Sequence, residues 1–61
     1  MDYGLAMTMA KSCLKEAYQM ACDRDWDGAE YVLAELVDYA VRAKLSIREK
    51  RDAEAKGNDD A

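Results

Sequence analysis

The chain has 61 residues, of which 51% are hydrophobic and 36% are charged, and its formal net charge is -4 at pH 7. A chain of this length forms one small domain at most and usually needs a disulfide, a metal or a partner chain for stability. Its negative charge argues against general binding to nucleic acids or anionic membranes. The sequence has no signal-peptide pattern at its start and no apolar run of bilayer-spanning length, so we expect a cytoplasmic location without membrane contact.

The first predicted element is a helix over about residues 3–22. Its apolar residues recur in steps of three and four, which draws one stripe along an α-helix. We call this stripe the first ladder: Tyr3, Met7, Ala10, Leu14, Ala17 and Ala21. Asp2 stands where an N-cap is needed. A second apolar row lies beside the ladder: Ala6, Cys13 and Met20.

Residues 23–25 are predicted to form a polar turn, and Asp25 is the best N-cap for a second helix over about residues 26–55. The second ladder follows the same spacing: Trp26, Ala29, Leu33, Leu36, Ala40, Ala43 and Ile47. No proline interrupts either helix. The hairpin is expected to occupy residues 1–56, and the polar composition from Gly57 onward predicts a disordered tail over 57–61.

The predicted fold is all-α, a two-helix antiparallel hairpin. Further apolar side chains flank the second ladder: Val32 and Tyr39 on one side, Val37 and Val41 on the other. A lone hairpin covers one stripe on each helix, and large exposed apolar patches are rare on soluble monomers. We therefore expect a homodimeric four-helix bundle, with a different partner chain or a higher oligomer as alternatives. The expected core or dimer residues are Met7, Leu14, Trp26, Leu33, Leu36, Val37, Tyr39 and Ile47.

Catalysis and cofactor binding are not expected. The chain has no histidine, so a serine or cysteine nucleophile lacks its usual base. Cys13 and Cys22 lie nine residues apart, which on a continuous helix separates them by ~13 Å, beyond the ~7 Å reach of a disulfide. We expect both thiols to be reduced. An intermolecular disulfide or a redox role is the alternative.

The segment 23–28, Asp-Arg-Asp-Trp-Asp-Gly, resembles the opening of an EF-hand calcium loop. The family's bidentate glutamate at loop position 12 is replaced by Ala34 here. Trp26 and Ala29 are already in phase with the second ladder, so the helix should begin before a calcium loop could close. We therefore expect these carboxylates to act as helix caps, with no metal site.

Two further resemblances concern the hairpin. Residues 25–40 resemble the turn and following helix of tetratricopeptide-type hairpins, although one hairpin is too few for a solenoid. In size and layout the chain resembles the ROP-type plasmid regulators, which are dimers of helical hairpins that bind paired RNA loops. That resemblance implies nucleic-acid contact through the basic segment 42–51, whose cations are Arg42, Lys44, Arg48, Lys50 and Arg51.

Tyr31 points away from the second ladder and has Glu35 and Asp38 beside it, an aromatic anchor with a charged rim that is typical of protein-binding surfaces. The expected partner-binding residues are Tyr31, Glu35, Asp38, Arg42, Arg48 and Arg51. We expect a small non-enzymatic module that binds a larger protein as adaptor, regulator or inhibitor. Its size fits a phage- or plasmid-encoded modulator of a host protein. The alternative function is a ROP-like RNA- or DNA-binding hairpin dimer.

Overall fold

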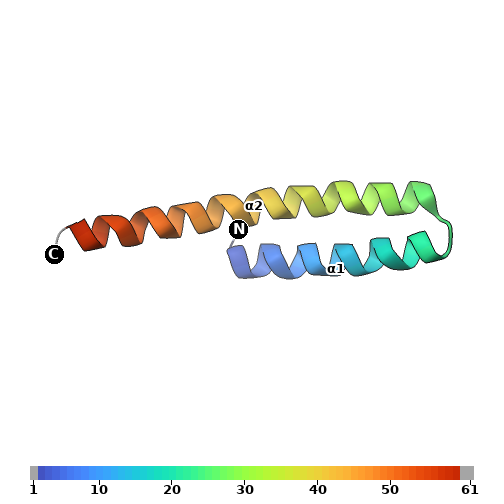
Figure 1. Ribbon diagram of the computed structural model, residues 1–61, viewed down its shortest axis with the longest axis horizontal. Helices are drawn as coiled ribbons and strands as arrows, with labels where there is room; N and C mark the ends of the chain where they lie inside the picture. The colour runs from blue at the N-terminus through green and yellow to red at the C-terminus, as the bar shows by residue number, and fades with distance from the viewer. Residues whose placement is uncertain (1, 60–61) are drawn as a thin grey trace.

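The computed structural model describes residues 2–59, which form two α-helices, α1 (Tyr3–Cys22) and α2 (Trp26–Asp59), and no strand. The helices run antiparallel along one another and are joined by a three-residue turn (Figure 1). The molecule measures 55 × 14 × 13 Å, a narrow rod one layer thick. The predicted all-α antiparallel hairpin is therefore confirmed. Neither helix combines the length and the apolar character that a bilayer span requires.

Side-chain and backbone caps fix the ends of α1. The Asp2 carboxylate accepts a hydrogen bond from the Gly4 amide at 3.2 Å, as the sequence predicted. At the other end, the amides of Arg24 and Asp25 donate to the carbonyls of Ala21 and Met20 at 3.0 and 2.8 Å. This pair of bonds is a Schellman motif, in which Arg24 takes the left-handed conformation (φ 62°) that glycine usually supplies.

Asp25 also starts α2. Its carboxylate accepts from the Gly28 amide at 3.1 Å, and its carbonyl accepts from the Ala29 amide at 3.0 Å. The predicted N-cap is thus confirmed. Asp27 lies in the first turn, where its negative charge is attracted to the positive end of the helix dipole.

The far end of α2 differs from the prediction. The helix continues to Asp59, whereas the sequence predicts a helix end near residue 55 and a disordered tail over residues 57–61. One glycine lowers helix propensity by only about 1 kcal/mol, and no proline is present to stop the helix. The remaining residues of the predicted tail, 60 and 61, lie outside the described residues.

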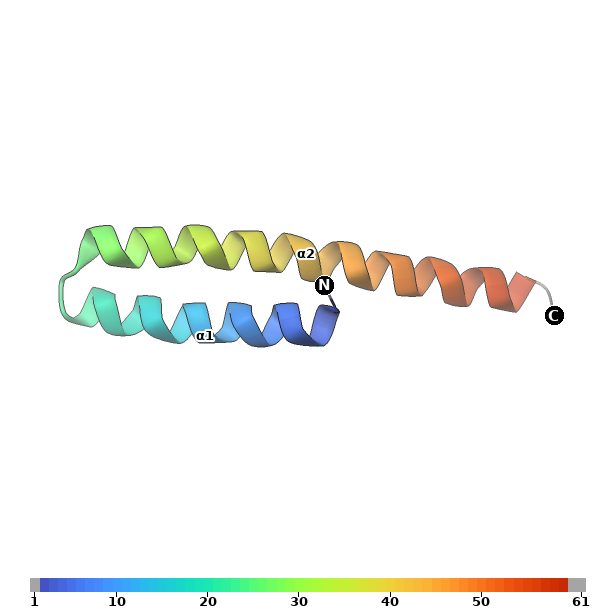
Figure 2. The same cartoon turned by 180° about the vertical axis from the view of Figure 1, so that it is seen from behind.

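Helix α2 is longer than α1 and projects beyond it (Figures 1 and 2). The start of α1 lies beside Lys50, whose ammonium nitrogen is 5.6 Å from the centre of the Tyr3 ring. Past this contact, the last turns of α2 have no helix of the same chain beside them. We call residues 51–59 the projecting end.

Small side chains form the contact between the helices. The buried residues are Ala6, Cys13 and Ala17 on α1, and Ala29, Val32 and Ala43 on α2. Met20, Leu36 and Tyr39 pack against them and are partly buried. Alanine and cysteine at these positions let the helix axes approach closely, because no bulky side chain holds them apart.

Most of the predicted core or dimer residues lie outside the contact between the two helices. Leu36 and Tyr39 join it, but six others are exposed in the single hairpin: Met7, Leu14, Trp26, Leu33, Val37 and Ile47. Met7 and Leu14 keep 52% and 57% of their surface exposed. The helices meet along Ala6 and Cys13 of the neighbouring row, together with the small ladder residues Ala17, Ala29 and Ala43. The reason is geometric, because each apolar face is wider than the strip that one neighbouring helix covers.

Candidate protein-interaction surfaces

The large side chains of the two ladders point toward the same broad side of the hairpin. A groove of about 370 Å³ runs between the helices there, with walls from Met7 and Ala10 of α1 and from Ala40, Ala43, Lys44 and Ile47 of α2. We call this side the ladder face and define its large residues as Tyr3, Met7, Leu14, Trp26, Leu33, Val37 and Ile47, all of which are exposed. The Lys50 ammonium lies over the Tyr3 ring, and each of these residues keeps at least 39% of its surface exposed.

Helix geometry explains why the ladders share a side. Successive residues turn by about 100° around a helix, so each ladder lies roughly 60° from the row that contacts the other helix. The rotation from contact row to ladder has the same sense along both helices, and the two helices run in opposite directions. Both ladders are therefore displaced toward the same side. Lys44, which the sequence predicts only as a cation of the basic segment, lies at the rim of the groove because it is four residues from Ala40 and three from Ile47.

The opposite side carries the predicted partner-binding tyrosine. Tyr31 is 69% exposed and lies two residues, or about 200°, around α2 from Leu33 of the ladder face. Glu35, Asp38 and Arg42 follow it in steps of four, three and four, which places all four on one stripe. We call these four residues the Tyr31 face.

The Tyr31 face is only slightly hollowed. A depression of about 160 Å³ is lined by Glu35, Asp38, Tyr39 and Arg42. The Arg42 guanidinium carbon lies 5.8 Å from the centre of the Tyr39 ring, close enough for a cation–π interaction. This contact holds a positive charge beside two carboxylates, so the surface offers both signs of charge around an exposed aromatic ring.

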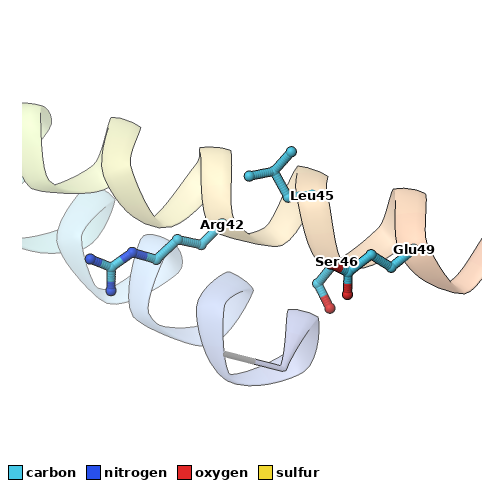
Figure 3. Close-up of a pocket in the computed structure, with 4 residues that line it drawn as sticks. All are labelled: Arg42, Leu45, Ser46 and Glu49. Carbon is cyan, nitrogen blue, oxygen red and sulfur yellow. The ribbon is translucent and has the colours of Figure 1, made fainter.

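A neighbouring hollow of about 340 Å³ is lined by Arg42, Leu45, Ser46 and Glu49, all on α2 (Figure 3). In Figure 3 the Leu45 side chain projects to the opposite side of the helix from Ser46, and the Arg42 guanidinium extends away from Glu49. The side chains do not converge on a common point. This part of the surface therefore suits a macromolecule better than a small ligand, which needs an enclosing pocket.

The predicted partner-binding residues fall into two groups. Arg48 and Arg51 lie six and nine residues after Arg42, which turns them away from the Tyr31 face toward the ladder side. Arg51 is paired with Asp52, with 3.9 Å between Nε and Oδ1, and both side chains are well exposed. Such a pair contributes little to stability. The basic end is thus a separate surface from the Tyr31 face.

Both cysteines are free. Cys13 is buried in the helix contact, whereas Cys22 is exposed. Burial raises the pKa of the Cys13 thiol, and the negative charges of Glu35 and Glu16 raise it further. A buried neutral thiol is a poor nucleophile, so the structure gives Cys13 a packing role.

The acidic turn, residues 23–25, caps the start of α2. Helix α2 begins at Trp26, as its periodicity predicted, and the Asp25 carboxylate is engaged with the Gly28 amide. Among the described residues, no group of three or more potential ligand side chains could hold a metal ion.

In comparisons with known proteins, the chain matches no protein-family model, no curated protein and no solved structure.

Proposed function

We propose that this chain is a non-enzymatic protein-binding module that works as a homodimer. Two hairpins pack ladder face against ladder face in a four-helix bundle and leave both Tyr31 faces outside. The dimer binds a larger protein and acts on it as an adaptor, regulator or inhibitor. The observation that supports this proposal most is the difference between the two sides of the hairpin, one an apolar groove and the other an aromatic residue among charges.

The amount of exposed surface supports the dimer. The hairpin exposes 5069 Å², whereas a compact monomer of this length exposes about 4000 Å². Large apolar side chains of the ladder face are part of this exposed surface, among them Met7, Leu14 and Val37 at 52%, 57% and 58% exposed. A second hairpin stacked on this face would remove them from water, which contributes about 25 cal/mol for each Å² of apolar surface covered.

The Tyr31 face supports target binding. An exposed tyrosine buries a large rigid surface on contact and loses little side-chain entropy, and charges around it can pair at the rim of an interface. Stacking the ladder faces leaves the two Tyr31 faces on opposite outer sides of the bundle. Each dimer would then offer two identical sites, which suits an adaptor that bridges two target molecules.

Affinity capture with tagged protein, from cells of the source organism, tests the proposal. A target retained by the native chain should be purified and its affinity measured against two variants. Tyr31→Ala should weaken binding at least tenfold, or about 1.4 kcal/mol. Tyr18→Ala is the matched control, since Tyr18 on α1 is similarly exposed at 72%. Equal affinity of the native chain and Tyr31→Ala would exclude the Tyr31 face as the target site.

Nucleic-acid binding is the second candidate function. It is favoured by the basic side chains at and next to the projecting end, Arg48, Lys50 and Arg51, which are exposed. An RNA or DNA ligand would be held through its phosphates, so its affinity would fall steeply with salt. If binding to an RNA column is lost with the charge reversal Arg48→Glu and Arg51→Glu but survives Tyr31→Ala, this second function replaces the first. A phage- or plasmid-encoded regulator is the biological setting we propose for either function.

A further inference from the structure

A stripe of exposed side chains runs along α2 at the outer edge of the ladder face. Its members recur in steps of three and four, so they lie on one side of the helix. We call it the rim stripe: Trp26, Glu30, Leu33, Val37, Val41, Lys44, Arg48 and Arg51. Its middle is apolar, the acid Glu30 lies near its beginning, and its last three members are basic.

The rim stripe is complementary to its own reverse about Val37. Glu30 and Lys44 lie seven residues before and after Val37, and Leu33 and Val41 lie four residues before and after it. Farther out, Trp26 and Arg48 are each eleven residues away, and Asp23 in the turn and Arg51 are each fourteen. Reversal therefore sets apolar residues against apolar ones, acids against bases, and an aromatic ring against a guanidinium.

We infer that the occupant of the ladder face is a second copy of this chain whose α2 packs antiparallel on the first α2, with the two turns at opposite ends of the bundle. This inference rests on the homodimer of the proposed function and specifies its topology. A two-fold axis beside Val37 brings Glu30 of each copy to Lys44 of the other. The same axis brings Arg48 to Trp26 and Arg51 to Asp23 of the other copy.

The other face-to-face arrangement sets both turns at the same end, with α2 of each copy on α1 of the other. It would gather the turn acids of both copies, Asp23, Asp25 and Asp27, at one end of the bundle. At the other end it would gather the cations Arg48, Lys50 and Arg51 of both copies. Like charges at short range oppose association, and opposite charges favour it.

Repulsion between lysine side chains of the two α1 helices acts against the inferred arrangement. Lys11 and Lys15 lie near the middle of α1 on the side of that helix turned away from α2, and the two-fold axis brings Lys11 of one copy toward Lys15 of the other. Both side chains are exposed and flexible, so their ammonium groups can separate in water. The complementary contacts at both ends outnumber this repulsion.

The distance between the projecting ends distinguishes the two topologies. A spin label on Ala55→Cys, in a chain that also carries Cys13→Ala and Cys22→Ala, lies eighteen residues from Val37. With turns at opposite ends, the two labels of a dimer should be about 54 Å apart, at 1.5 Å per helical residue. With turns at the same end, neighbouring helix axes are about 8–10 Å apart and the labels should lie within about 25 Å. Dilution with unlabelled chain must remove the signal if it arises between copies.

A charge exchange tests the contact itself. Glu30→Lys should weaken self-association roughly three- to tenfold, because two ion pairs are lost in each dimer. Glu30→Lys combined with Lys44→Glu should restore association to within about threefold of the native chain. If turns lie at the same end, Glu30 and Lys44 do not meet and the second change gives no rescue.

The outcomes separate this inference from the proposed function. A dimer whose labels lie within 25 Å, or a dimer without rescue, overturns the antiparallel α2 contact and leaves the homodimer standing. A monomer in sedimentation equilibrium at micromolar concentration overturns both. Loss of target binding on Tyr31→Ala bears on the proposed function alone.

Discussion

The Gly28 amide donates a hydrogen bond to the Asp25 carboxylate, with 3.1 Å between N and Oδ1, and a Cβ at Gly28 would collide with that same carboxylate. Glycine is usually a poor choice inside a helix, by about 1 kcal/mol relative to alanine. Here its missing side chain makes room for the cap that starts α2. The cap and the glycine are therefore coupled.

A double-mutant cycle measures this coupling. Asp25→Ala should lower the free energy of unfolding by about 1 kcal/mol. Gly28→Ala should change it by less than about 0.5 kcal/mol in the native chain, because the gain in helix propensity is offset by displacement of the cap. In the Asp25→Ala background, Gly28→Ala should stabilise by about 0.5–1 kcal/mol. Denaturant unfolding at fixed protein concentration provides the values, and equal effects in both backgrounds would contradict the coupling.

Arg24→Gly should stabilise the hairpin. The Arg24 backbone has φ 62°, a left-handed conformation that costs a residue with a Cβ about 1 kcal/mol and costs glycine almost nothing. We expect the free energy of unfolding to rise by about 0.5–1 kcal/mol, reduced somewhat by the greater freedom of glycine in the unfolded chain. Arg24→Ala is the control, since alanine keeps the Cβ and loses only the guanidinium. A similar gain in both variants would trace the effect to charge.

Aspartate substitutions should separate the hairpin contact from the ladder face. Val32 is 7% exposed and Val37 is 58% exposed. Val32→Asp should destroy the helical circular dichroism signal, because an unpaired buried charge costs several kcal/mol, comparable to the stability of so small a domain. Val37→Asp should instead shift the sedimenting mass toward the monomer. Tyr31→Asp, at a similarly exposed position (69%) on the opposite side of α2, should leave the mass unchanged.

Cys13 and Cys22 should differ in reactivity. At pH 8, iodoacetamide should modify Cys22 much faster than Cys13, as followed by mass spectrometry of the two peptides, because burial hides Cys13 and raises its pKa. The raised pKa also sets the sign of a stability effect. The folded state holds the Cys13 thiol proton more tightly than the unfolded state. The contribution of Cys13 to the free energy of unfolding is therefore fully present below the ordinary thiol pKa of 9.0, and it is lost as pH rises above that value. Cys13→Ala should remove that part of the alkaline destabilisation, and an unchanged pH dependence would contradict the assignment.

The amino-acid sequence by itself determined where the helices begin and that they form a hairpin. Asp2 and Asp25 are caps whose action depends only on residues two and three positions away, so local hydrogen bonding decides them. The steps of three and four in both ladders specify helices whatever surrounds them. The end of α2 was harder to place, since no strong stop signal marks it and Gly57 does not interrupt the helix.

Only the tertiary structure decided which part of each apolar face meets the other helix. Periodicity identifies a wide apolar face on α1, but it does not predict whether Met7 or Ala6 contacts α2. The hairpin takes Ala6, Cys13 and Ala17, because small side chains allow the axes to approach closely and maximise packing along the whole contact. The larger Met7 and Leu14 are thereby turned outward. The ladder face thus arises from competition for close packing between two helices, which neither helix sequence expresses alone.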